Sequence, residues 1–386
     1  MGHWINELFP RLKLRRQEGL YRNRNIVDSP QGSRIFHSGK SYLNFSSNDY
    51  LGLANHPTVV EAFQVAAKKY GVGAGASHLL FGHQRPHQIL EQAIAQFTNR
   101  DRALVFSSGY MANLGIFNAL IGKDDLVIQD KYNHASLIDG ALASKGKLIR
   151  YKHNSIEHAE KILNKNHNSR KVLAVDGVFS MDGDIAPLDK LSTLCGLHNT
   201  VLMVDDAHAL GVIGKTGKGS SELFNLDQQH LPILMGTLGK SFGVSGAFVA
   251  GSDDLIEYLI QYTRTYIYTT ALPPASAAAA YSSLNIFYDE PNRLEHLNQL
   301  INYFKNFFPD LNFKFLPSNT PIQPMIIGDS QKALKISKML FQKGIIAPAI
   351  RPPTVPYGGA RLRITLTASH TFSDIDELIM TLQEIK

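Results

Sequence analysis

The chain of 386 residues contains 44% hydrophobic and 19% charged residues, which is typical of a globular protein with one or two domains. Its formal net charge of +6 is too diffuse to indicate a nucleic-acid partner, although it suits an anionic substrate or an acidic carrier. The single cysteine, Cys195, excludes an internal disulfide and is expected to pack in the core. No apolar run reaches the ~18 residues of a membrane span, so we expect no membrane partner.

The N-terminal residues 2–20 are predicted to form an amphipathic helix, which the basic segment 21–24 follows. Glu7 argues against a signal peptide, and Asn6 stands where a myristoylation site requires Ser or Thr. We therefore expect a cytoplasmic protein. Arg22 is either a solvated side chain or an anion contact at the mouth of a pocket.

The next segments are predicted to form a turn, a helix and a loop. Residues 42–53 contain a short strand and a polar turn that Asn48 can cap, and residues 57–70 form a helix. The glycine-rich run at 71–83 looks at first like a dinucleotide-binding motif. However, Ala76 replaces the third glycine, and a helix precedes the run where the motif requires a strand. We therefore interpret the run as a flexible loop.

His83, His87 and Glu91 are spaced at i, i+4 and i+8, which would place three metal ligands on one helical face. Pro86 indicates that the helix begins near His87, so His83 falls outside it. We therefore expect capping or packing histidines in this segment, and no metal site in the chain.

A predicted strand at 103–106 leads into a helix whose first residues are Gly109 and Tyr110. The N-terminus of a helix attracts anions through its free N–H groups and its positive dipole end. Gly109 and Tyr110 are therefore candidate phosphate-binding residues. An ordinary strand–helix turn is the alternative.

Strands and helices alternate from residue 103 to residue 250, which predicts an α/β domain with a mostly parallel sheet flanked by helices. Ligands of such sheets bind beyond the carboxyl ends of the strands. Polar or small residues that follow predicted strands are therefore candidates for one shared site: Gly109, His134, Ser180, Asp205, His208 and Lys240. His134 either caps the helix that follows it or lies flat against an aromatic ring.

Lys240 follows a buried strand at 233–235, and four glycines surround it at positions 236, 239, 243 and 246. A lysine in such a pocket loses water, which favours its neutral, nucleophilic amine. Asp205 ends another predicted buried strand and precedes Asp206. A lysine that forms a Schiff base, together with a carboxylate for a pyridinium nitrogen, is the protein's part of pyridoxal phosphate (PLP) chemistry.

The last third of the chain is predicted to form a second α/β domain. A helical stretch from 275 to 308 breaks near Pro291, and the chain ends in a helix at 373–385. Arg361 and Arg363 share one face of a strand, where a guanidinium can bind a carboxylate through two parallel bonds. The predicted domains are an N-terminal segment (1–45), a large PLP-binding α/β domain (46–275) and a small C-terminal α/β domain (276–386).

Five motifs resemble those of the α-oxoamine synthases, a family of fold-type-I PLP enzymes: NFSSNDYLGL, GVFSMDGDIAPL, VDDAHALGVIG, GTLGKSFGVSG and ARLRITLTA. The resemblance covers nearly the whole chain. It implies the fold-type-I architecture and a homodimer with its site at the interface. The segment IRPPTVP, at 350–356, resembles the subfamily that makes 8-amino-7-oxononanoate for biotin.

The resemblance also implies roles for matching residues. Lys240 corresponds to the lysine that binds PLP and moves protons, Asp205 to the partner of the pyridinium nitrogen, and His134 to the residue stacked on the ring. The other implied cofactor contacts are His208 and Ser180 near the phenolic oxygen, Gly109 and Tyr110 at the phosphate, Thr237, and Thr270 reaching across from a second subunit. The implied substrate contacts are Arg22, Asn48, His134, Thr354 and Arg363. The segment 73–80 departs from the family pattern, which puts the role of Ser77 in doubt.

The activity that this resemblance implies is a condensation of L-alanine with a pimeloyl thioester, with loss of CO2. The thioester would be carried by coenzyme A or by an acyl carrier protein. Three alternatives remain: a glycine C-acyltransferase such as 2-amino-3-ketobutyrate ligase, a fold-type-I aminotransferase, and a non-enzymatic binding protein on the same scaffold.

Overall fold

The computed structural model describes residues 3–166 and 170–385. These residues divide into two compact units. The larger unit comprises residues 48–180 and 184–296, and the smaller unit comprises the N-terminal 47 residues, residues 181–183 and residues 297–386. Among the described residues, no helix combines the length and the apolar character that crossing a membrane requires.

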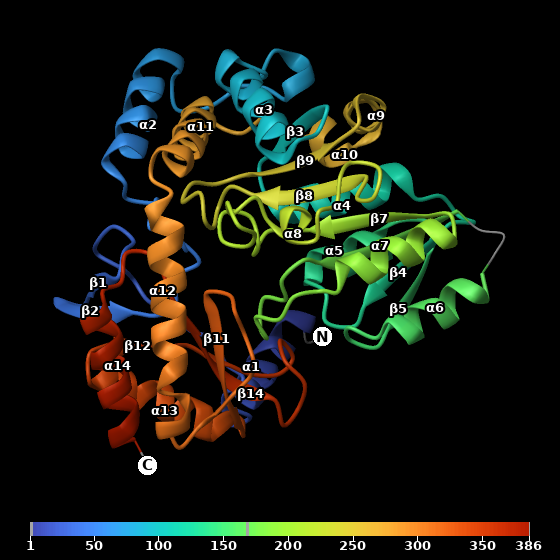
Figure 1. The fold of residues 1–386 in the computed structure, drawn as a ribbon. Coiled ribbons are helices and arrows are strands. Elements are labelled where there is room, and N and C mark those ends of the chain that lie inside the picture. Colours follow the sequence, from blue (N-terminus) through green and yellow to red (C-terminus); the bar gives the residue numbers. More distant parts are fainter. Residues whose placement is uncertain (1–2, 167–169, 386) are drawn as a thin grey trace. The chain divides into compact units, whose positions relative to one another are not determined.

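The larger unit is built on a seven-stranded sheet with the strand order β3-β9-β8-β7-β6-β4-β5 (Figure 1). Strands β4 to β8 run parallel to one another, and β9 is antiparallel to both β8 and β3. The predicted mostly parallel sheet is thereby confirmed. The strands are β3 (Arg102–Phe106), β4 (Leu126–Asp130), β5 (Lys147–Tyr151), β6 (Lys171–Asp176), β7 (Thr200–Asp205), β8 (Ile233–Thr237) and β9 (Ala247–Gly251).

Helices cover both faces of this sheet because successive strand residues point to opposite faces. In β7, Met203 belongs to the core cluster that contains residues of α4, α5, α9 and α10, whereas Leu202 and Val204 belong to the cluster that contains residues of α6 and α7. Cys195 of α7 is buried in the second cluster, as predicted. The helices of this unit are α2 (Pro57–Tyr70), α3 (Arg85–Thr98), α4 (Gly109–Leu120), α5 (Ala135–Ala143), α6 (Ile156–Asn164), α7 (Leu188–Leu197), α8 (Ser220–Leu223), α9 (Asp253–Tyr262), α10 (Arg264–Ile267), α11 (Pro274–Asp289) and the 3₁₀ helix η2 (His78–Leu80).

The smaller unit contains two further sheets, with the orders β1-β2-β12 and β10-β11-β14-β13. Their strands are β1 (Arg34–His37), β2 (Lys40–Asn44), β10 (Lys314–Phe315), β11 (Ile322–Gly328), β12 (Ile345–Ile346), β13 (Ala349–Ile350) and β14 (Ala360–Thr365). Its helices include α13 (Ser330–Gln342) and α14 (Phe372–Glu384), and α12 (Asn292–Asn306) begins in the larger unit and ends in this one.

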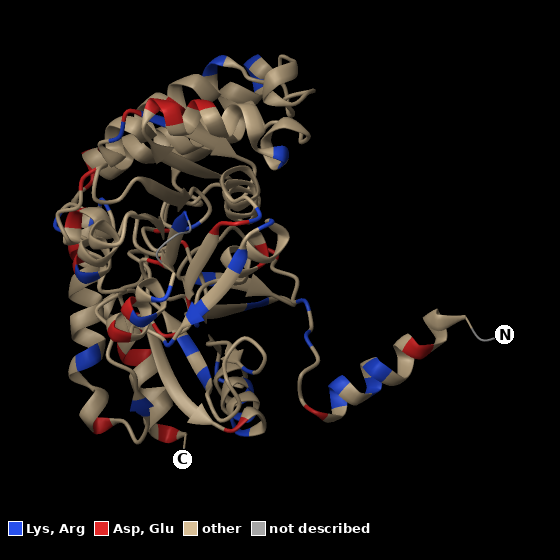
Figure 2. Ribbon diagram, turned by 90° about the vertical axis from the view of Figure 1, so that its right-hand side faces the viewer, with Lys and Arg blue, Asp and Glu red and all other residues tan. Residues whose placement is uncertain are grey.

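The N-terminal helix differs from the prediction in its extent. A 3₁₀ turn, η1 (Trp4–Glu7), leads into α1 (Leu8–Gln17), and neither segment has a buried residue. Figure 2 shows several Lys and Arg positions along α1, where the sequence places Arg11, Lys13, Arg15 and Arg16.

Most predicted elements agree with the structure at their ends. The helix predicted at 57–70 has those bounds, and α3 begins at Arg85, close to His87, where its start was expected. Thr263, which is fully buried, separates α9 from α10. The expected break near Pro291 separates α11 from α12. The three-domain division stays a prediction.

A partly buried ionic cluster lies at the carboxyl end of β4. His153 contacts Asp130 through Nδ1 at 3.0 Å and Asp184 through Nε2 at 2.9 Å. Its ring stacks on Tyr132, with ring centroids 4.5 Å apart. Burial lowers the pKa of His153, but the hydrogen bonds and charges of the two aspartates outweigh burial and raise it to about 10. The imidazolium is therefore the folded-state form at neutral pH.

We predict that His153→Gln lowers the free energy of unfolding by about 2–4 kcal/mol near neutral pH, because two partly buried carboxylates lose their cation. The pKa of this histidine is higher in the folded chain than in the unfolded chain, so its contribution is complete below pH ~6.5 and is lost as the pH rises toward 10. Urea unfolding of both proteins from pH 5 to 10 checks this. If the difference in free energy of unfolding between the parent and the variant stays constant up to pH 10, the prediction is wrong.

Candidate active site

Three parallel strands bring the main candidate residues together at one edge of the large sheet. Asp176 and Asp205 are the last residues of β6 and β7, and they are register partners. In β8, Met235 is in register with Asp205, and Lys240 follows this strand after a short turn. The expected clustering of polar residues at the carboxyl ends of the strands is therefore what the fold shows.

Asp205 is a buried carboxylate held by neutral donors. Its Oδ2 accepts a hydrogen bond from Asn113 Nδ2 at 2.7 Å, and its Oδ1 accepts one from the Ala207 N–H at 3.0 Å. Asn113 also donates to Ser136 Oγ at 2.9 Å. Sequence analysis missed Asn113 and Ser136, although Asn113 lies one helical turn after Gly109 and shares its helix face.

The neighbouring Asp206 has a different environment. Its Oδ2 accepts the Ser220 N–H at 2.8 Å, and its Oδ1 accepts the Ser220 hydroxyl at 2.5 Å. Burial raises the pKa of Asp206 to about 7, against the lowering effect of these bonds. Asp206 therefore anchors the turn at residues 219–220, and of the two aspartates Asp205 is the one beside the other candidate residues.

His134 caps the helix α5 that follows it, which is one of the two alternatives that the sequence predicted. Its Nδ1 accepts the Ser136 N–H at 3.3 Å and lies 2.7 Å from Ser136 Oγ, and its backbone N–H donates to Asp176 at 2.8 Å. The side chain is exposed, but crowding by protein atoms lowers the pKa of the imidazole; the charge of Asp205 opposes this effect, and that of Lys240 adds to it. A neutral ring with an exposed surface suits stacking on a flat ligand.

His208 is held in place by Tyr50, a residue that the sequence analysis did not predict to belong to the site. Its Nδ1 lies 2.6 Å from the hydroxyl of Tyr50, a fully buried side chain. The same hydroxyl is within 3.3 Å of Asn48 Oδ1. Tyr50 therefore links two predicted site residues, His208 and Asn48.

The loop that carries Lys240 is shaped by the glycine at 243. Lys240 is half-buried, and its carbonyl accepts the Gly243 N–H at 2.8 Å. Gly243 has φ +67°, and a Cβ there would lie 2.3 Å from the backbone nitrogen of Ala54. Gly239 has no such restriction, since the nearest atom to its Cβ would be 3.5 Å away. Thr237 closes the other end of the loop by donating to the Gly246 carbonyl at 3.0 Å.

The predicted phosphate-binding residues lie at the start of α4. Ser108 is the N-cap, and its Oγ accepts the Met111 N–H at 3.3 Å. Gly109 and Tyr110 follow in the first helical turn, whose N–H groups have no acceptor within the helix. The Tyr110 hydroxyl also contacts Asp139. This helix end therefore has the donors that an anion requires.

Two further predicted cofactor residues also belong to the larger unit. The carbonyl of Thr270 accepts a hydrogen bond from Ser107 Oγ at 3.4 Å, so Thr270 lies beside the start of α4 in the same chain. Ser180 is the last residue of its part of this unit, four residues after β6. Their side-chain roles stay predictions.

The smaller unit contains the predicted substrate residues Arg22, Thr354 and Arg363. Arg22 Nη2 lies 3.4 Å from Thr354 Oγ1. Burial, and then the nearby charge of Arg22, lower the pKa of Arg351, which contacts the Gly19 carbonyl. Two guanidinium groups thus lie close together, which is the charge arrangement of an anion site.

Arg361 and Arg363, both buried on β14, differ in their partners. Arg361 is paired with Asp182 and also bonds the Gly359 carbonyl at 2.9 Å. Arg363 Nη1 donates to Thr365 Oγ1 at 3.0 Å, a neutral partner. Arg361 is therefore bound to a carboxylate of its own unit, and the role of Arg363 as a contact of the substrate carboxylate stays a prediction.

The donor set of the larger unit fits PLP. It provides a lysine for the carbonyl carbon, a buried carboxylate for the ring nitrogen, an exposed imidazole for the ring face and a helix N-terminus for the phosphate. All four groups come from the same rigid sheet and the helices that follow its strands.

We predict that Gly243→Ala destabilises the protein by about 2 kcal/mol or more, because alanine would be forced into a left-handed conformation and against backbone. Gly239→Ala is the matched control and should change stability by less than about 1 kcal/mol. Denaturant unfolding of both variants measures the difference. Equal stability of the two would refute this account of the loop.

Comparisons with known proteins agree with this geometry. Residues 40–382 match the family model described as aminotransferase class I and II. The 8-amino-7-oxononanoate synthase of Hahella chejuensis (strain KCTC 2396) is 50% identical over 386 residues, which cover 100% of this chain and 97% of that protein. The crystal structure of 8-amino-7-oxononanoate synthase from Francisella tularensis is 34% identical with a TM-score of 0.78, covering 89% of this chain and 97% of the other.

A serine palmitoyltransferase from S. paucimobilis with a bound PLP–myriocin aldimine is 28% identical, with a TM-score of 0.93 and coverage of 100% of this chain and 98% of that chain. The predicted fold-type-I architecture is thereby confirmed. The chain belongs to the aminotransferase class I and II family and, within it, to the 8-amino-7-oxononanoate synthases.

Proposed function

We propose that the chain condenses L-alanine with a pimeloyl thioester to give 8-amino-7-oxononanoate, CO2 and the free thiol of the carrier, as a PLP-dependent acyltransferase of biotin synthesis. The supporting observation is the position of Asp205 at the end of β7 and of Lys240 just after the adjacent parallel strand β8, in a chain about half identical to synthases of this name. The thioester carrier is coenzyme A or an acyl carrier protein.

The roles of the cofactor-site residues follow from their chemistry. Bound PLP supplies an electron sink for the electron pair left on the substrate when its α-proton is removed. Asp205, held by neutral donors, keeps a proton on the pyridine nitrogen. Lys240 accepts the α-proton as a general base and returns a proton to the product. His134 stacks on the ring face.

The remaining cofactor contacts position PLP. His208 and Ser180 bind near the phenolic oxygen, and Tyr50 holds His208 in place through its hydroxyl. Gly109, Tyr110 and Thr237 bind the phosphate side. Within its own chain Thr270 bonds Ser107 through its carbonyl, and the family resemblance implies that it contacts the phosphate held by a second subunit. The homodimer and the cytoplasmic location are proposed from this resemblance.

The two substrates require two separate anion contacts. The α-carboxylate of alanine must stay fixed while its α-proton leaves, and Arg363 offers a planar guanidinium that binds two oxygens at once. The acyl donor carries a distal carboxylate and the phosphates of its carrier. Arg22 and Thr354, which lie together near the second cation Arg351, are proposed to bind it. Asn48 and His134 complete the substrate contacts.

Lys240→Ala should bind PLP without a covalent bond and lose turnover by about 10³-fold or more, because the base at the α-carbon is gone. In the parent protein, borohydride reduction followed by peptide mapping should find PLP on the peptide that contains Lys240. Lys215→Ala serves as the control, which should keep both label and activity. A label on any other lysine would overturn the assignment.

Arg363→Ala is expected to raise the KM for L-alanine by about 10–100-fold, the effect of losing a charge-assisted bond, with little change for the thioester. Arg22→Ala is expected to raise the KM for pimeloyl-CoA instead. Steady-state kinetics with each substrate varied in turn, and product mass, test both statements.

Two results would count against the proposed activity. If both variants shift the same KM, the two-anion model fails. If glycine with acetyl-CoA is a better substrate pair than alanine with pimeloyl-CoA, or if amino groups are exchanged without release of CO2, the chain has one of the alternative activities.

A further inference from the structure

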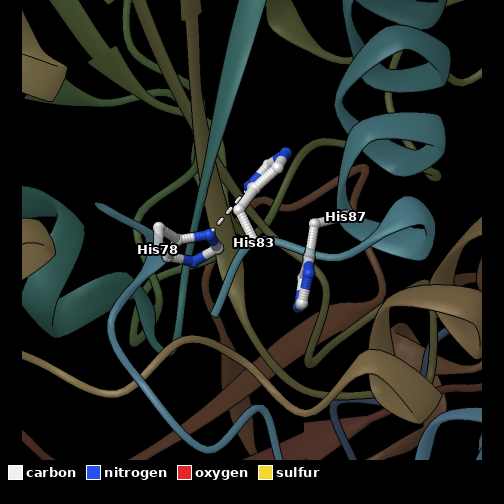
Figure 3. Close-up of side chains that lie close together, drawn as sticks. All are labelled: His78, His83 and His87. Atoms are coloured by element: carbon white, nitrogen blue, oxygen red, sulfur yellow. Dashed lines mark hydrogen bonds between the residues drawn. The ribbon is translucent and has the colours of Figure 1, made fainter. Parts of the chain in front are cut away.

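Three histidines gather on the segment that begins α3, apart from the residues assigned to PLP. His78 lies in η2, His83 in the following loop and His87 in the first turn of α3. One nitrogen from each ring lies within 4.8 Å of one nitrogen from each of the others, and Figure 3 shows His78 and His83 joined by a hydrogen bond with His87 beside them. Nδ1 of His78 is 2.9 Å from Nδ1 of His83.

This spacing is close to that of two ligands on one metal ion. With metal–nitrogen bonds of about 2.0–2.1 Å, two imidazole nitrogens on one ion lie about 2.9 Å apart at a right angle and about 3.4 Å apart at the tetrahedral angle. The Nδ1–Nδ1 distance between His78 and His83 is therefore at the lower end of this range. Small rotations of the two rings would lengthen it to the tetrahedral value.

The surroundings hold the rings in place and keep them neutral. His78 is buried and stacks on Tyr266 of α10, with centroids 4.6 Å apart and planes 10° apart. Burial lowers the pKa of all three histidines, that of His78 to about 3. Neutral imidazole is the form that binds metal, so no proton has to be released to solvent at neutral pH.

A buried acceptor on the same segment, Oγ of Ser77, lacks a hydrogen-bond partner among the described residues. A carboxylate is also near, since Glu91 Oε2 lies 3.9 Å from His83 Nε2. Buried acceptors without partners are rare in native proteins. Water on a bound cation would supply the donor that Ser77 Oγ lacks.

We propose that His78, His83 and His87 bind a divalent transition-metal ion of the Zn²⁺ type, with water as the fourth ligand. The proton between the two Nδ1 atoms moves to Nε2 of the ring that carries it, and the ion takes its place. His87 gives up its acceptor bond to the Gln84 N–H, 2.9 Å away, and keeps the 2.6 Å contact of its Nε2 with the Leu272 carbonyl.

Such an ion would tie the glycine-rich loop to α3 and to the segment near residue 272. Its role is therefore structural, since none of the three histidines is among the proposed substrate or cofactor contacts. The site does not depend on the proposed function, because it can be measured without turnover.

The test uses the PLP-loaded protein without a histidine tag, titrated with Co²⁺ in a buffer that does not bind metals. The parent should show saturable visible absorption at one Co²⁺ per chain, which Zn²⁺ abolishes, and a higher melting temperature with Zn²⁺. His83→Gln, at a side chain 27% exposed, should weaken Co²⁺ binding by more than about tenfold.

His230→Gln is the matched control. His230 is an exposed histidine with its own carboxylate partner, Asp227, at 2.7 Å, so its loss should leave Co²⁺ binding unchanged. His78→Phe keeps a ring against Tyr266 and should also abolish binding. The proposal is overturned if the parent binds no stoichiometric Co²⁺, or if His83→Gln, folded by circular dichroism, binds it as tightly as the parent.

Discussion

The site depends on one buried interaction, the hold of neutral donors on the Asp205 carboxylate at the end of β7. A carboxylate that is 5% exposed costs free energy unless its oxygens are hydrogen-bonded, and Asn113 and the Ala207 N–H supply those bonds. Neither donor is charged. These two donors therefore leave the negative charge of the carboxylate in place, whereas an arginine in their position would have neutralised it. This is the condition for a carboxylate that stabilises a protonated ring nitrogen.

The same interaction fixes the distance between two ends of the cofactor site. Asn113 and Gly109 belong to α4 and are one helical turn apart, so the bond from Asn113 to Asp205 also positions the helix end proposed to bind the phosphate. A further bond from Asn113 to Ser136, which contacts His134, extends the network to α5. Groups proposed for the ring nitrogen, the ring face and the phosphate are therefore connected through one amide side chain.

The sequence predicts the parts of this site that follow from position along a strand. Periodicity places Asp205, Lys240 and His134 after buried strands, and parallel strands end at one edge, so their proximity was predictable. The sequence did not predict which of two neighbouring residues of the same type belongs to the site. Asp205 and Asp206 are adjacent in sequence, and Arg361 and Arg363 are two residues apart on one strand. Three of these residues are distinguished by a partner far away in sequence: Asn113 for Asp205, Ser220 for Asp206 and Asp182 for Arg361. Such partners are set by tertiary packing, which local patterns do not contain.

The turn at residues 182–184 contributes one aspartate to an ion pair in each of the two units. Asp182 belongs to the smaller unit and pairs with Arg361, whereas Asp184 belongs to the larger unit and pairs with His153. Between them, Gly183 has φ +68°, and a Cβ there would lie 2.5 Å from the Ile322 carbonyl. Two acidic residues around one glycine would suit a calcium loop, but each carboxylate here already has a protein cation. The motif is therefore a structural turn in which each charge stabilises its own unit.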